Sequence, residues 1–546
     1  MFTYLHCYMP ETWDAQIRAG LVDDHSGIRF SQSIDIEERL KFNNLARMGG
    51  DLWNIVSDLR CPFYIDRLQG GCYFEGYDYD MALVEKYRRL LGEKFWGFQM
   101  HEWMSNTGSD IGKLRRGGCP AWTEDAITDT IRRVFPFPHL FIESMTAKEM
   151  ADFGEPRSWQ DFLHMTGTMF NRRMAYTGGD LLPADSYCLA YPLELRAGVR
   201  RIMPEIGAQT TDTRVQLAFA RGMAKGAGIS FGAYYEPWGG DPFSACNYHR
   251  EGLNEWNIRQ GVDFPFETKG AGGGSSRSLQ KRMHLYAYMA GASFMAEEWG
   301  MCNTFYDWHD FELTPYGQIK LDFLNFTRKY PDVGTPIIPA AVVLPAELDV
   351  LESLYESGDV YVGYPASGEL AGKLRQMREG LRLLFTESSP MVGTETHNLR
   401  NHTLPDALDI VTADYFKTDA YPHVIDLTGD AAFAQKYADK LVTIDELPGV
   451  LDRELPCRVE GGLHHMVNKR ADGTFCLMIF NHSGISRTVA GGEQTIPGAE
   501  RTVTVTLKDN RTLRVLAGDS GVAAVSAENR RYHVTVPAGG WCFAEF

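Results

Sequence analysis

The chain has 546 residues and a formal net charge of −17, from 54 Lys and Arg against 71 Asp and Glu. Its 44% hydrophobic and 12% aromatic content is enough for several folded domains and excludes a disordered protein. The acidic excess argues against nucleic acid or an anionic membrane as a partner, and no apolar run approaches the roughly 20 residues that a membrane-spanning helix needs.

Residues 1–335 alternate short apolar runs with segments of helical periodicity. The expected strands, in chain order, are Tyr4–Tyr8, a piece within Ile28–Ile55, Phe63–Asp66, Phe95–Met100, Leu140–Glu143, Ile202–Ile206, Ile229–Tyr235 and Ser293–Glu297. The clearest helical patterns between them are Asp80–Leu91, Glu124–Val134, Trp159–Tyr176, Thr213–Gly226 and Ser278–Ala290. A series of eight strand-then-helix units predicts an α/β fold that begins with a (β/α)₈ TIM barrel over residues 1–335.

Two further domains are expected after the barrel. Residues 336–452 begin at a pair of prolines and contain three short strand patterns with helical segments between them, which predicts a small flavodoxin-like α/β domain: strands Ala340–Leu344, Asp409–Thr412 and Val424–Leu427, helices Leu370–Leu384 and Ala431–Lys440. Residues 453–546 alternate apolar and polar positions, which predicts a C-terminal antiparallel β-sandwich: Phe475–Phe480, Thr502–Leu507, Tyr532–Val536 and Trp541–Phe546.

Acidic residues follow several of the expected barrel strands. Barrel enzymes carry their chemistry at the carboxyl ends of the strands, so acids at these positions are candidates for the site: Glu102, Glu143, Glu205, Glu236, Glu297 and Glu298. Aromatic residues stand beside some of them: Trp103, Tyr235, Trp238 and Trp299. A sugar ring stacks on flat aromatic faces while its hydroxyls bond to carboxylates, so the combination indicates a carbohydrate site. Aromatic residues are also common in barrel cores, which is the alternative for each of them.

The segment Phe95–Trp103, with the sequence FWGFQMHEW, resembles the fourth-strand segment of the family 42 β-galactosidases, retaining glycoside hydrolases of clan A. Tyr235–Gly239 (YEPWG) stands where that family has its seventh-strand nucleophile, and Lys281–Met295 resembles the helix that leads into the eighth strand. The order of barrel, small α/β domain and β-domain is also similar. The resemblance implies that Glu102 is the acid/base, that Glu236 is the nucleophile and that the small α/β domain contributes to a homo-oligomer. One departure is His101, which replaces an Asn that bonds to the sugar 2-hydroxyl in the family.

Glycoside hydrolysis needs two carboxylates, one to protonate the departing oxygen and one to attack or to activate water. We therefore expect Glu102 and Glu236 to be catalytic. The expected substrate-binding residues are His101, Trp103, Glu205, Tyr235, Trp238, Glu298 and Trp299. Neighbours in a strand point in opposite directions, so one of Glu297 and Glu298 faces the cavity and the other faces the helices; the alternation leaves open which, and Glu298 is the choice here. His101 either bonds to the substrate or orients Glu102. No cofactor and no metal ion are expected, since two carboxylates suffice and no metal-ligand spacing stands out.

The expected function is an exo-acting, retaining, β-galactosidase-like glycoside hydrolase on a small oligosaccharide or glycoside. The alternatives are an inverting glycosidase, a lyase or a transglycosidase on the same barrel, and a non-catalytic carbohydrate-binding barrel. The ten cysteines are spaced singly and the first residues do not resemble a signal peptide, so a cytoplasmic location is expected.

Overall fold

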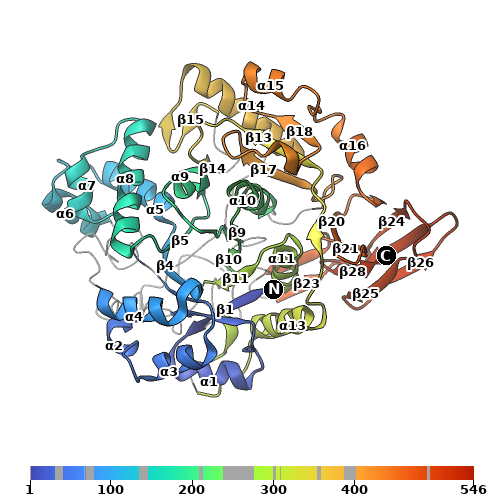
Figure 1. The fold of residues 1–546 in the computed structure, drawn as a ribbon, viewed down its shortest axis with the longest axis horizontal. Helices are drawn as coiled ribbons and strands as arrows, with labels where there is room; N and C mark the ends of the chain where they lie inside the picture. Colours follow the sequence, from blue (N-terminus) through green and yellow to red (C-terminus); the bar gives the residue numbers. More distant parts are fainter. Residues whose placement is uncertain are drawn as a thin grey trace.

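The computed structural model describes residues 2–30, 41–66, 68, 79–134, 145–207, 213–237, 276–298, 303–307, 309–352, 358–385, 401–488 and 492–546. These segments form a parallel barrel, a small α/β sheet and a C-terminal pair of antiparallel sheets (Figure 1). In Figure 1 the barrel runs from blue to yellow, the small α/β part from gold to orange, and most of the antiparallel sheets are red.

The barrel consists of one eight-stranded parallel sheet with the order β5-β4-β3-β2-β1-β11-β10-β8. In chain order its strands are β1 (Thr3–Tyr8), β2 (Ser26–Phe30), β3 (Phe63–Ile65), β4 (Phe95–His101), β5 (Leu181–Ala184), β8 (Glu205–Ile206), β10 (Ala233–Tyr235) and β11 (Phe294–Glu297). The two outermost strands are joined by a bond from the Glu205 amide to the Asp185 carbonyl, 3.3 Å long. The short strands β7 (Arg201–Ile202) and β9 (Ser230–Phe231), which precede β8 and β10 in the chain, pair with each other in parallel. The TIM barrel expected from the sequence is confirmed.

The fifth strand differs from the expectation. It is β5 (Leu181–Ala184), whereas the predicted Leu140–Glu143 lies outside the described residues, as does the candidate acid Glu143. The second strand, β2, begins at Ser26, two residues before the expected range 28–55, and ends at Phe30. The order of the later strands is unaffected, so Glu102, Glu205 and Glu236 still follow or lie in the fourth, sixth and seventh strands.

A bulge in β4 decides which side chains of this strand face the barrel interior. The register of β4 against β3 shifts near Gly97, whose φ is +87° and whose Cβ, if present, would lie 2.0 Å from the Asp180 carbonyl oxygen. Only glycine fits this combination of conformation and close approach. After the bulge, Gln99 and His101 share the interior face of the strand.

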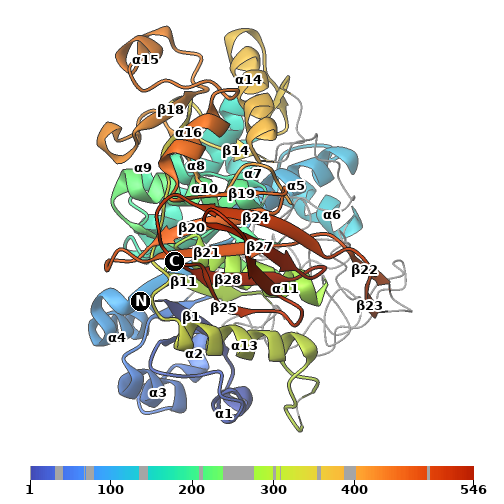
Figure 2. The ribbon, with the colours of Figure 1, turned by 90° about the vertical axis from the view of Figure 1, so that its right-hand side faces the viewer.

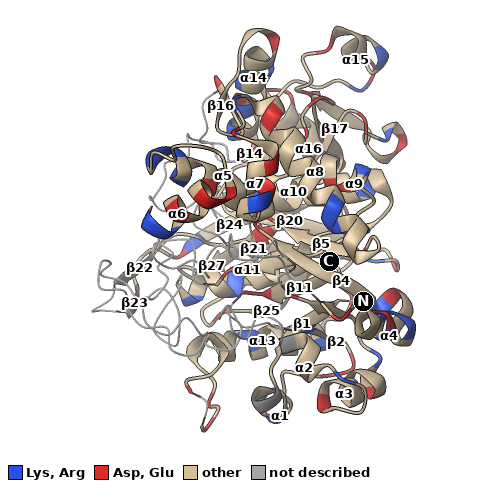
Figure 3. Ribbon diagram, turned by 90° about the vertical axis from the view of Figure 1, so that its left-hand side faces the viewer, with Lys and Arg blue, Asp and Glu red and all other residues tan. Residues whose placement is uncertain are grey.

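Helices surround the barrel: α1 (Pro10–Arg18), α2 (Lys41–Leu45), α3 (Asp51–Leu59), α4 (Met81–Leu91), α5 (Trp103–Arg116), α6 (Glu124–Val134), α7 (Ala147–Phe153), α8 (Trp159–Thr177), α9 (Tyr191–Arg196), α10 (Thr213–Ala227), α11 (Arg277–Met289) and α13 (Pro315–Lys329). The five helices expected from the sequence match α4, α6, α8, α10 and α11 to within one residue at each end. Outward-facing helices such as α4 and α6 carry charges of both signs (Figure 3). Among the described helices, none is both long and apolar enough to cross a bilayer.

The small α/β part has a three-stranded parallel sheet with the order β17-β13-β18. Its elements are β13 (Ala340–Leu344), β17 (Leu408–Thr412), β18 (His423–Asp426), α14 (Gly368–Phe385), α15 (Ala431–Lys436) and α16 (Leu447–Glu454). The three strands and α14 match the expectation to within two residues, whereas α15 ends four residues before the expected Lys440 and α16 has no counterpart among the expected helices. Barrel helix α10 packs directly on β17, where Arg221 and Lys225 both bond to the Asp409 carboxylate at 2.6 Å. The small sheet is therefore tied to the barrel through a buried ionic contact.

The C-terminal residues form the expected β-sandwich. One sheet has the order β12-β20-β21-β28-β25 and the other β19-β24-β27-β26: β12 (Thr335–Pro336), β19 (Cys457–Glu460), β20 (His464–Lys469), β21 (Phe475–Phe480), β24 (Arg501–Leu507), β25 (Arg514–Gly518), β26 (Ala523–Ser526), β27 (Arg531–Val536) and β28 (Trp541–Glu545). Leu477 and Ile479 of one sheet and Val503 and Val505 of the other lie in their shared core. The first sheet lies beside α11 and α13 of the barrel (Figure 2), with the Phe326 and Phe543 rings 5.3 Å apart. Shorter strand pairs complete the structure: β6 (Cys188–Leu189) with β14 (Leu351–Glu352), β15 (Val360–Tyr361) with β16 (Tyr364–Pro365), and β22 (Ile485–Thr488) with β23 (Gly492–Thr495).

Candidate active site

The barrel interior has an apolar layer followed by a polar layer towards the carboxyl ends of the strands. The apolar layer is a cluster of side chains from different strands: Leu5, Tyr64, Leu182, Ala184, Met203, Tyr234, Phe294 and Ala296, with Trp96 against it. Residues that lie two positions further along these strands point to the same side. The residues of the polar layer are buried: Arg29, Asp66, Gln99, His101, Glu205, Glu236 and Glu298. Buried polar groups are costly without partners, so their concentration at this end marks the candidate site.

Arg29 of β2 forms hydrogen bonds with groups at the ends of three other barrel strands. Its Nη2 donates to the Asp66 carboxylate at 2.5 Å and to the Tyr234 hydroxyl at 3.1 Å, and its Nη1 donates to the Glu297 carbonyl at 2.8 Å. Burial by itself lowers the pKa of Arg29, but the Asp66 carboxylate outweighs it and the pKa is raised well above its ordinary value. This permanent cation fixes the strands from which the site residues project.

His101, Glu205 and Glu298 meet at the centre of the polar layer, although they come from the fourth, sixth and eighth strands. The His101 Nε2 lies 3.1 Å from Glu205 Oε1 and 3.6 Å from Glu298 Oε1, and all three side chains are at most 2% exposed. The edge of the imidazole packs against the Tyr234 ring, with 5.3 Å between the ring centroids. His101 is therefore held between two carboxylates.

Glu102 lies where β4 turns into α5, and its backbone is in the left-handed region, with φ 41° and ψ 36°. A residue other than glycine in this region carries strain, which is concentrated at functional sites. The Glu102 amide still donates to the Ala184 carbonyl, at 2.5 Å. Its carboxylate accepts hydrogen bonds from Asn106 Nδ2 and Ser186 Oγ, each at 3.1 Å. The turn thus presents a partly buried carboxylate in a fixed orientation at the mouth of the barrel.

The pKa of Glu102 is raised above its ordinary value, principally because burial disfavours the charged carboxylate. The charges of Glu298 and Asp185 act in the same direction, whereas His101 and the hydrogen bond from Ser186 lower the pKa. A carboxyl group with a raised pKa retains its proton nearer to neutral pH, which a general acid requires.

Asp185 and Ser186, at the end of β5, hold the start of α5 and the Glu102 side chain. Asp185 Oδ2 accepts from the amides of Met104 and Ser105, both at 3.1 Å, and thereby caps the helix that begins directly after Glu102. Sequence reasoning missed Asp185, Ser186 and Asn106. The first two follow Leu181–Ala184 directly, but this run is short and contains Pro183, so the sequence did not mark it as a barrel strand.

Replacing Ser186 by alanine is expected to raise the pKa of Glu102, because the hydroxyl donates to the charged form of the carboxylate. A general acid is active while protonated, so the basic limb of the kcat/KM profile moves to higher pH, by about one pH unit or less. The measurement is the pH profile of kcat/KM for Ser186→Ala beside that of the wild type. An unchanged basic limb would show that Ser186 does not act on the ionising acid.

Glu236 follows β10, the seventh barrel strand, and its side chain is 4% exposed. Its amide donates to the Ile206 carbonyl at 2.9 Å. The next carbonyl, that of Pro237, accepts from Gln280 Nε2 of α11 at 2.9 Å, which fixes the chain where it leaves the strand. The expected binding residues Trp238 and Trp299 lie outside the described residues.

Two expected substrate-binding residues are buried against the helices that surround the barrel. Trp103 is fully buried, its ring lies 4.7 Å from Phe170 of α8, and its Nε1 donates to Glu194 Oε1 at 3.3 Å. Tyr235 is also fully buried and packs edge-on against His284 of α11, with the centroids 5.2 Å apart. Neither ring has an exposed face on which a sugar could stack.

The adjacent pair Glu297 and Glu298 is divided between the two sides of β11. Glu297 accepts from the hydroxyls of Tyr4 (3.0 Å) and Tyr316 (2.5 Å) and pairs with Lys320 of α13, so it faces the helices. Glu298 faces His101 in the barrel interior. Alternation along a strand accounts for the division.

The substitution Trp103→Phe separates a core role from a binding role. It removes the hydrogen bond to Glu194, whose pKa burial raises to about 8, and it leaves space beside Phe170. The free energy of unfolding should therefore fall by about 1–3 kcal/mol. The KM for any substrate should remain within about twofold of the wild-type value, since the ring is fully buried against α8. Urea unfolding and steady-state kinetics measure the two effects, and a several-fold rise in KM at unchanged stability would contradict the core role.

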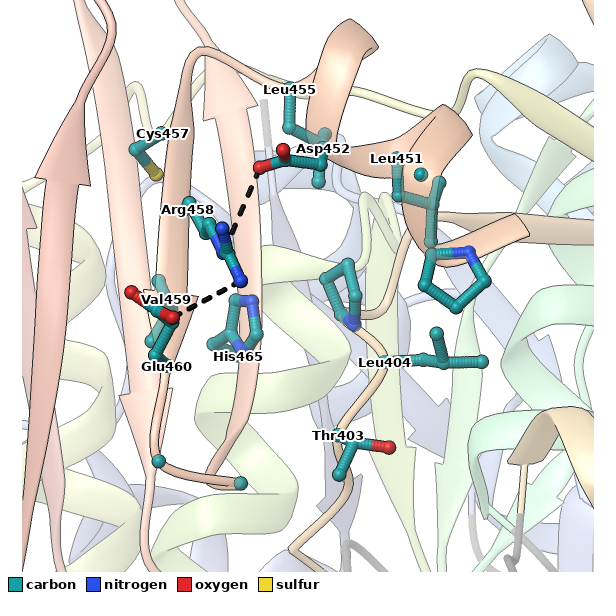
Figure 4. Close-up of a pocket in the computed structure, with 15 residues that line it drawn as sticks. Thr403, Leu404, Leu451, Asp452, Leu455, Cys457, Arg458, Val459, Glu460 and His465 are labelled. Carbon is teal, nitrogen blue, oxygen red and sulfur yellow. Dashed lines mark ion pairs between the residues drawn. The ribbon is translucent and has the colours of Figure 1, made fainter. Parts of the chain in front are cut away.

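A separate cavity of about 410 Å³ lies between α16 and β19 and is lined by residues that follow the barrel in the chain (Figure 4). Arg458 at its wall pairs with Glu460 at 3.1 Å and with Asp452 at 3.9 Å. Burial lowers the pKa of His465 to about 4, so this imidazole is neutral near pH 7. The acids of this cavity are already paired with arginine, and we therefore place the chemistry in the barrel.

Neither a family model nor a curated protein sequence matches the chain. Among solved structures, it is similar to the catalytic module of a family 98 glycoside hydrolase from Streptococcus pneumoniae TIGR4, with 10% identity, a TM-score of 0.46 and coverage of 100% of this chain and 98% of that one. It is similar to α-L-fucosidase isoenzyme 2 from Paenibacillus thiaminolyticus (10% identity, TM-score 0.44, coverage 100% and 98%). A β-galactosidase from the haloarchaeon Halorubrum lacusprofundi gives 11% identity, a TM-score of 0.43 and coverage of 100% and 99%. Similarity at this level does not identify an activity, so the function has to be inferred from the site itself.

Proposed function

We propose that the protein is a glycoside hydrolase that works from the mouth of the barrel, with Glu102 as the acid/base and Glu236 as the nucleophile. The observation that carries the proposal is the Glu102 carboxyl group, which has a raised pKa and is oriented by Asn106 and Ser186 on a strained turn. Glu236 supports it as a second carboxylate, three strands further along the chain at the same end of the barrel.

The proposed reaction is a double displacement with retention of configuration. The Glu236 carboxylate attacks the anomeric carbon while Glu102 donates its proton to the departing glycosidic oxygen, which forms a glycosyl–enzyme ester and releases the first product. Water then attacks the same carbon, Glu102 accepts the water proton, and Glu236 leaves as a carboxylate. Atoms and charges balance without a cofactor.

The remaining polar residues suit the recognition of a single sugar at the end of a chain or of a simple glycoside. Glu205 and Glu298 offer carboxylate acceptors for hydroxyl groups, and His101 stands in place of the Asn that bonds to the 2-hydroxyl in the family 42 β-galactosidases, which the fourth-strand segment resembles. We therefore propose exo action on a small oligosaccharide or glycoside, β-galactosidase-like in type. A cytoplasmic location and a homo-oligomer are part of the same proposal.

The test is hydrolysis of a panel of p-nitrophenyl α- and β-glycosides, followed by proton NMR of the first-formed product. Turnover of one glycoside with release of the same anomer supports a retaining hydrolase, whereas release of the opposite anomer replaces it with an inverting one. Binding of a sugar without turnover of any panel member or natural oligosaccharide would overturn the enzymatic proposal in favour of a carbohydrate-binding barrel.

A further inference from the structure

Three potential metal-ligand atoms converge in the polar layer of the barrel. The His101 Nε2, a Glu205 oxygen and a Glu298 oxygen all lie within 4.8 Å of one another, and each side chain is buried. The separations from the imidazole nitrogen are 3.1 Å to Glu205 and 3.6 Å to Glu298. One imidazole and two carboxylates are a donor set that holds zinc and related divalent ions.

The spacing of these atoms fits a shared ion. Two ligands that are about 2.0–2.2 Å from one ion, at angles between 90° and 110°, are roughly 2.8–3.6 Å apart. The two nitrogen–oxygen separations of 3.1 and 3.6 Å fall in this range. The donors also come from three strands of a rigid barrel, so an ion could bind without rearrangement of the backbone.

Electrostatics favours a cation at the same place. Two buried carboxylates within 4.8 Å of each other repel unless a positive charge or a proton lies between them. A divalent ion supplies more compensation than a protonated imidazole can.

An independent observation comes from Gln99, two residues before His101 on the interior face of β4. The side chain is fully buried, and within the described part of the chain neither its Oε1 nor its Nε2 has a hydrogen-bond partner. A buried amide without partners costs free energy, which a ligand or an ion-bound water beside it would recover. Gln99 thus points to a polar occupant of the barrel interior, one inward-facing position before His101 on β4.

We propose that His101, Glu205 and Glu298 bind one divalent transition-metal ion, with zinc as the preferred ion. The mixed nitrogen and oxygen ligands favour zinc over calcium and magnesium, which take oxygen ligands almost exclusively. The remaining coordination positions of the ion take oxygen ligands, and in the proposed glycosidase these are hydroxyls of the sugar. Glu102 and Glu236 retain their roles, because no step of the double displacement passes through the ion.

The experiment is titration calorimetry of the full chain with ZnCl₂ after removal of bound metal by a chelator and dialysis. We expect one ion per chain with a dissociation constant in the micromolar range or below. His101→Ala should weaken binding at least 100-fold, and Glu205→Gln and Glu298→Gln each about 10–100-fold. The matched control is Glu194→Gln, a buried glutamate that contacts Trp103, which should leave zinc affinity unchanged.

Two results would overturn the site. One is the absence of binding at roughly 100 μM Zn²⁺, and the other is the same affinity and stoichiometry in His101→Ala as in the wild type. Circular dichroism and the thermal midpoint of each variant verify that the fold is intact. Calcium and magnesium titrations should give binding at least 100-fold weaker than zinc. Because metal binding is measured without substrate, its failure is distinguishable from failure of the proposed hydrolase activity.

Discussion

Replacing Glu236 by alanine is expected to reduce hydrolysis of the best p-nitrophenyl glycoside on the order of 10⁴-fold or more, because the variant lacks the group that forms the glycosyl–enzyme ester. Azide is small enough to enter the space that the carboxylate leaves. Added azide should therefore restore part of the activity and give a glycosyl azide of inverted configuration. Steady-state kinetics and NMR of the azide product measure both effects.

Glu102→Ala is the matched comparison. The p-nitrophenolate group departs with little protonation, so this variant should lose less on activated glycosides than on natural ones. With Glu236 intact, its azide product should have retained configuration. Full activity of Glu236→Ala would show that another acid is the nucleophile.

The helices were predictable because their signal is local. The amphipathic patterns of α4 and α10, for example, lie within a single stretch of sequence, and both helices match the expectation to within one residue. The fifth barrel strand gave no comparable signal. Leu181–Ala184 is four residues long, fully buried and contains Pro183, so neither alternation nor strand propensity distinguishes it from a loop.

The positions of the acids at strand ends followed from the general construction of barrels, and so did the division between Glu297 and Glu298. The direction of the Trp103 side chain did not follow from this construction. At Glu102 the chain leaves the extended conformation for a left-handed one, with φ 41°, so the alternation of β4 no longer applies to the next residue. Trp103 begins α5 and its side chain lies against α8.

Contacts between distant strands were not accessible from the sequence. His101 and Glu205 are 104 residues apart in the chain, yet they lie at hydrogen-bond distance because the barrel brings its strand ends to one place. Metal-ligand spacing is recognisable in a sequence when the ligands share a helix or a short loop. The expectation that no metal binds was based on such spacing, which cannot detect donors from three separate strands.

The buried charges between α10 and β17 lead to the largest expected effect on stability. Asp409 is fully buried and bonds to Arg221, Lys225 and the Tyr421 hydroxyl at 2.6, 2.6 and 2.7 Å. Asp409→Asn leaves two cations at this interface without their anion, so the free energy of unfolding should fall by about 3–5 kcal/mol. Urea unfolding at pH 7 measures the loss, taken from the first transition because the chain has more than one domain.

The loss should depend on pH in a direction that the charges fix. Burial raises the pKa of Asp409, but Arg221 and Lys225 outweigh it and the pKa is lowered overall. A carboxylate with a lowered pKa stabilises the fold above the pKa of the unfolded chain, about 3.9, and this contribution is lost as the pH falls through the folded value. The difference between wild type and Asp409→Asn should therefore shrink below about pH 4.

Asp359→Ala is the control, since Asp359 pairs with Arg375 on the surface and its side chain is 67% exposed. Exposed pairs contribute little, so this variant should remain within about 0.5–1 kcal/mol of the wild type. An equally small loss in Asp409→Asn would mean that Arg221 and Lys225 find other partners or water once the carboxylate is removed. A difference from wild type that stays constant from pH 7 to below pH 4 would show that the loss comes from packing against β17, since packing does not titrate.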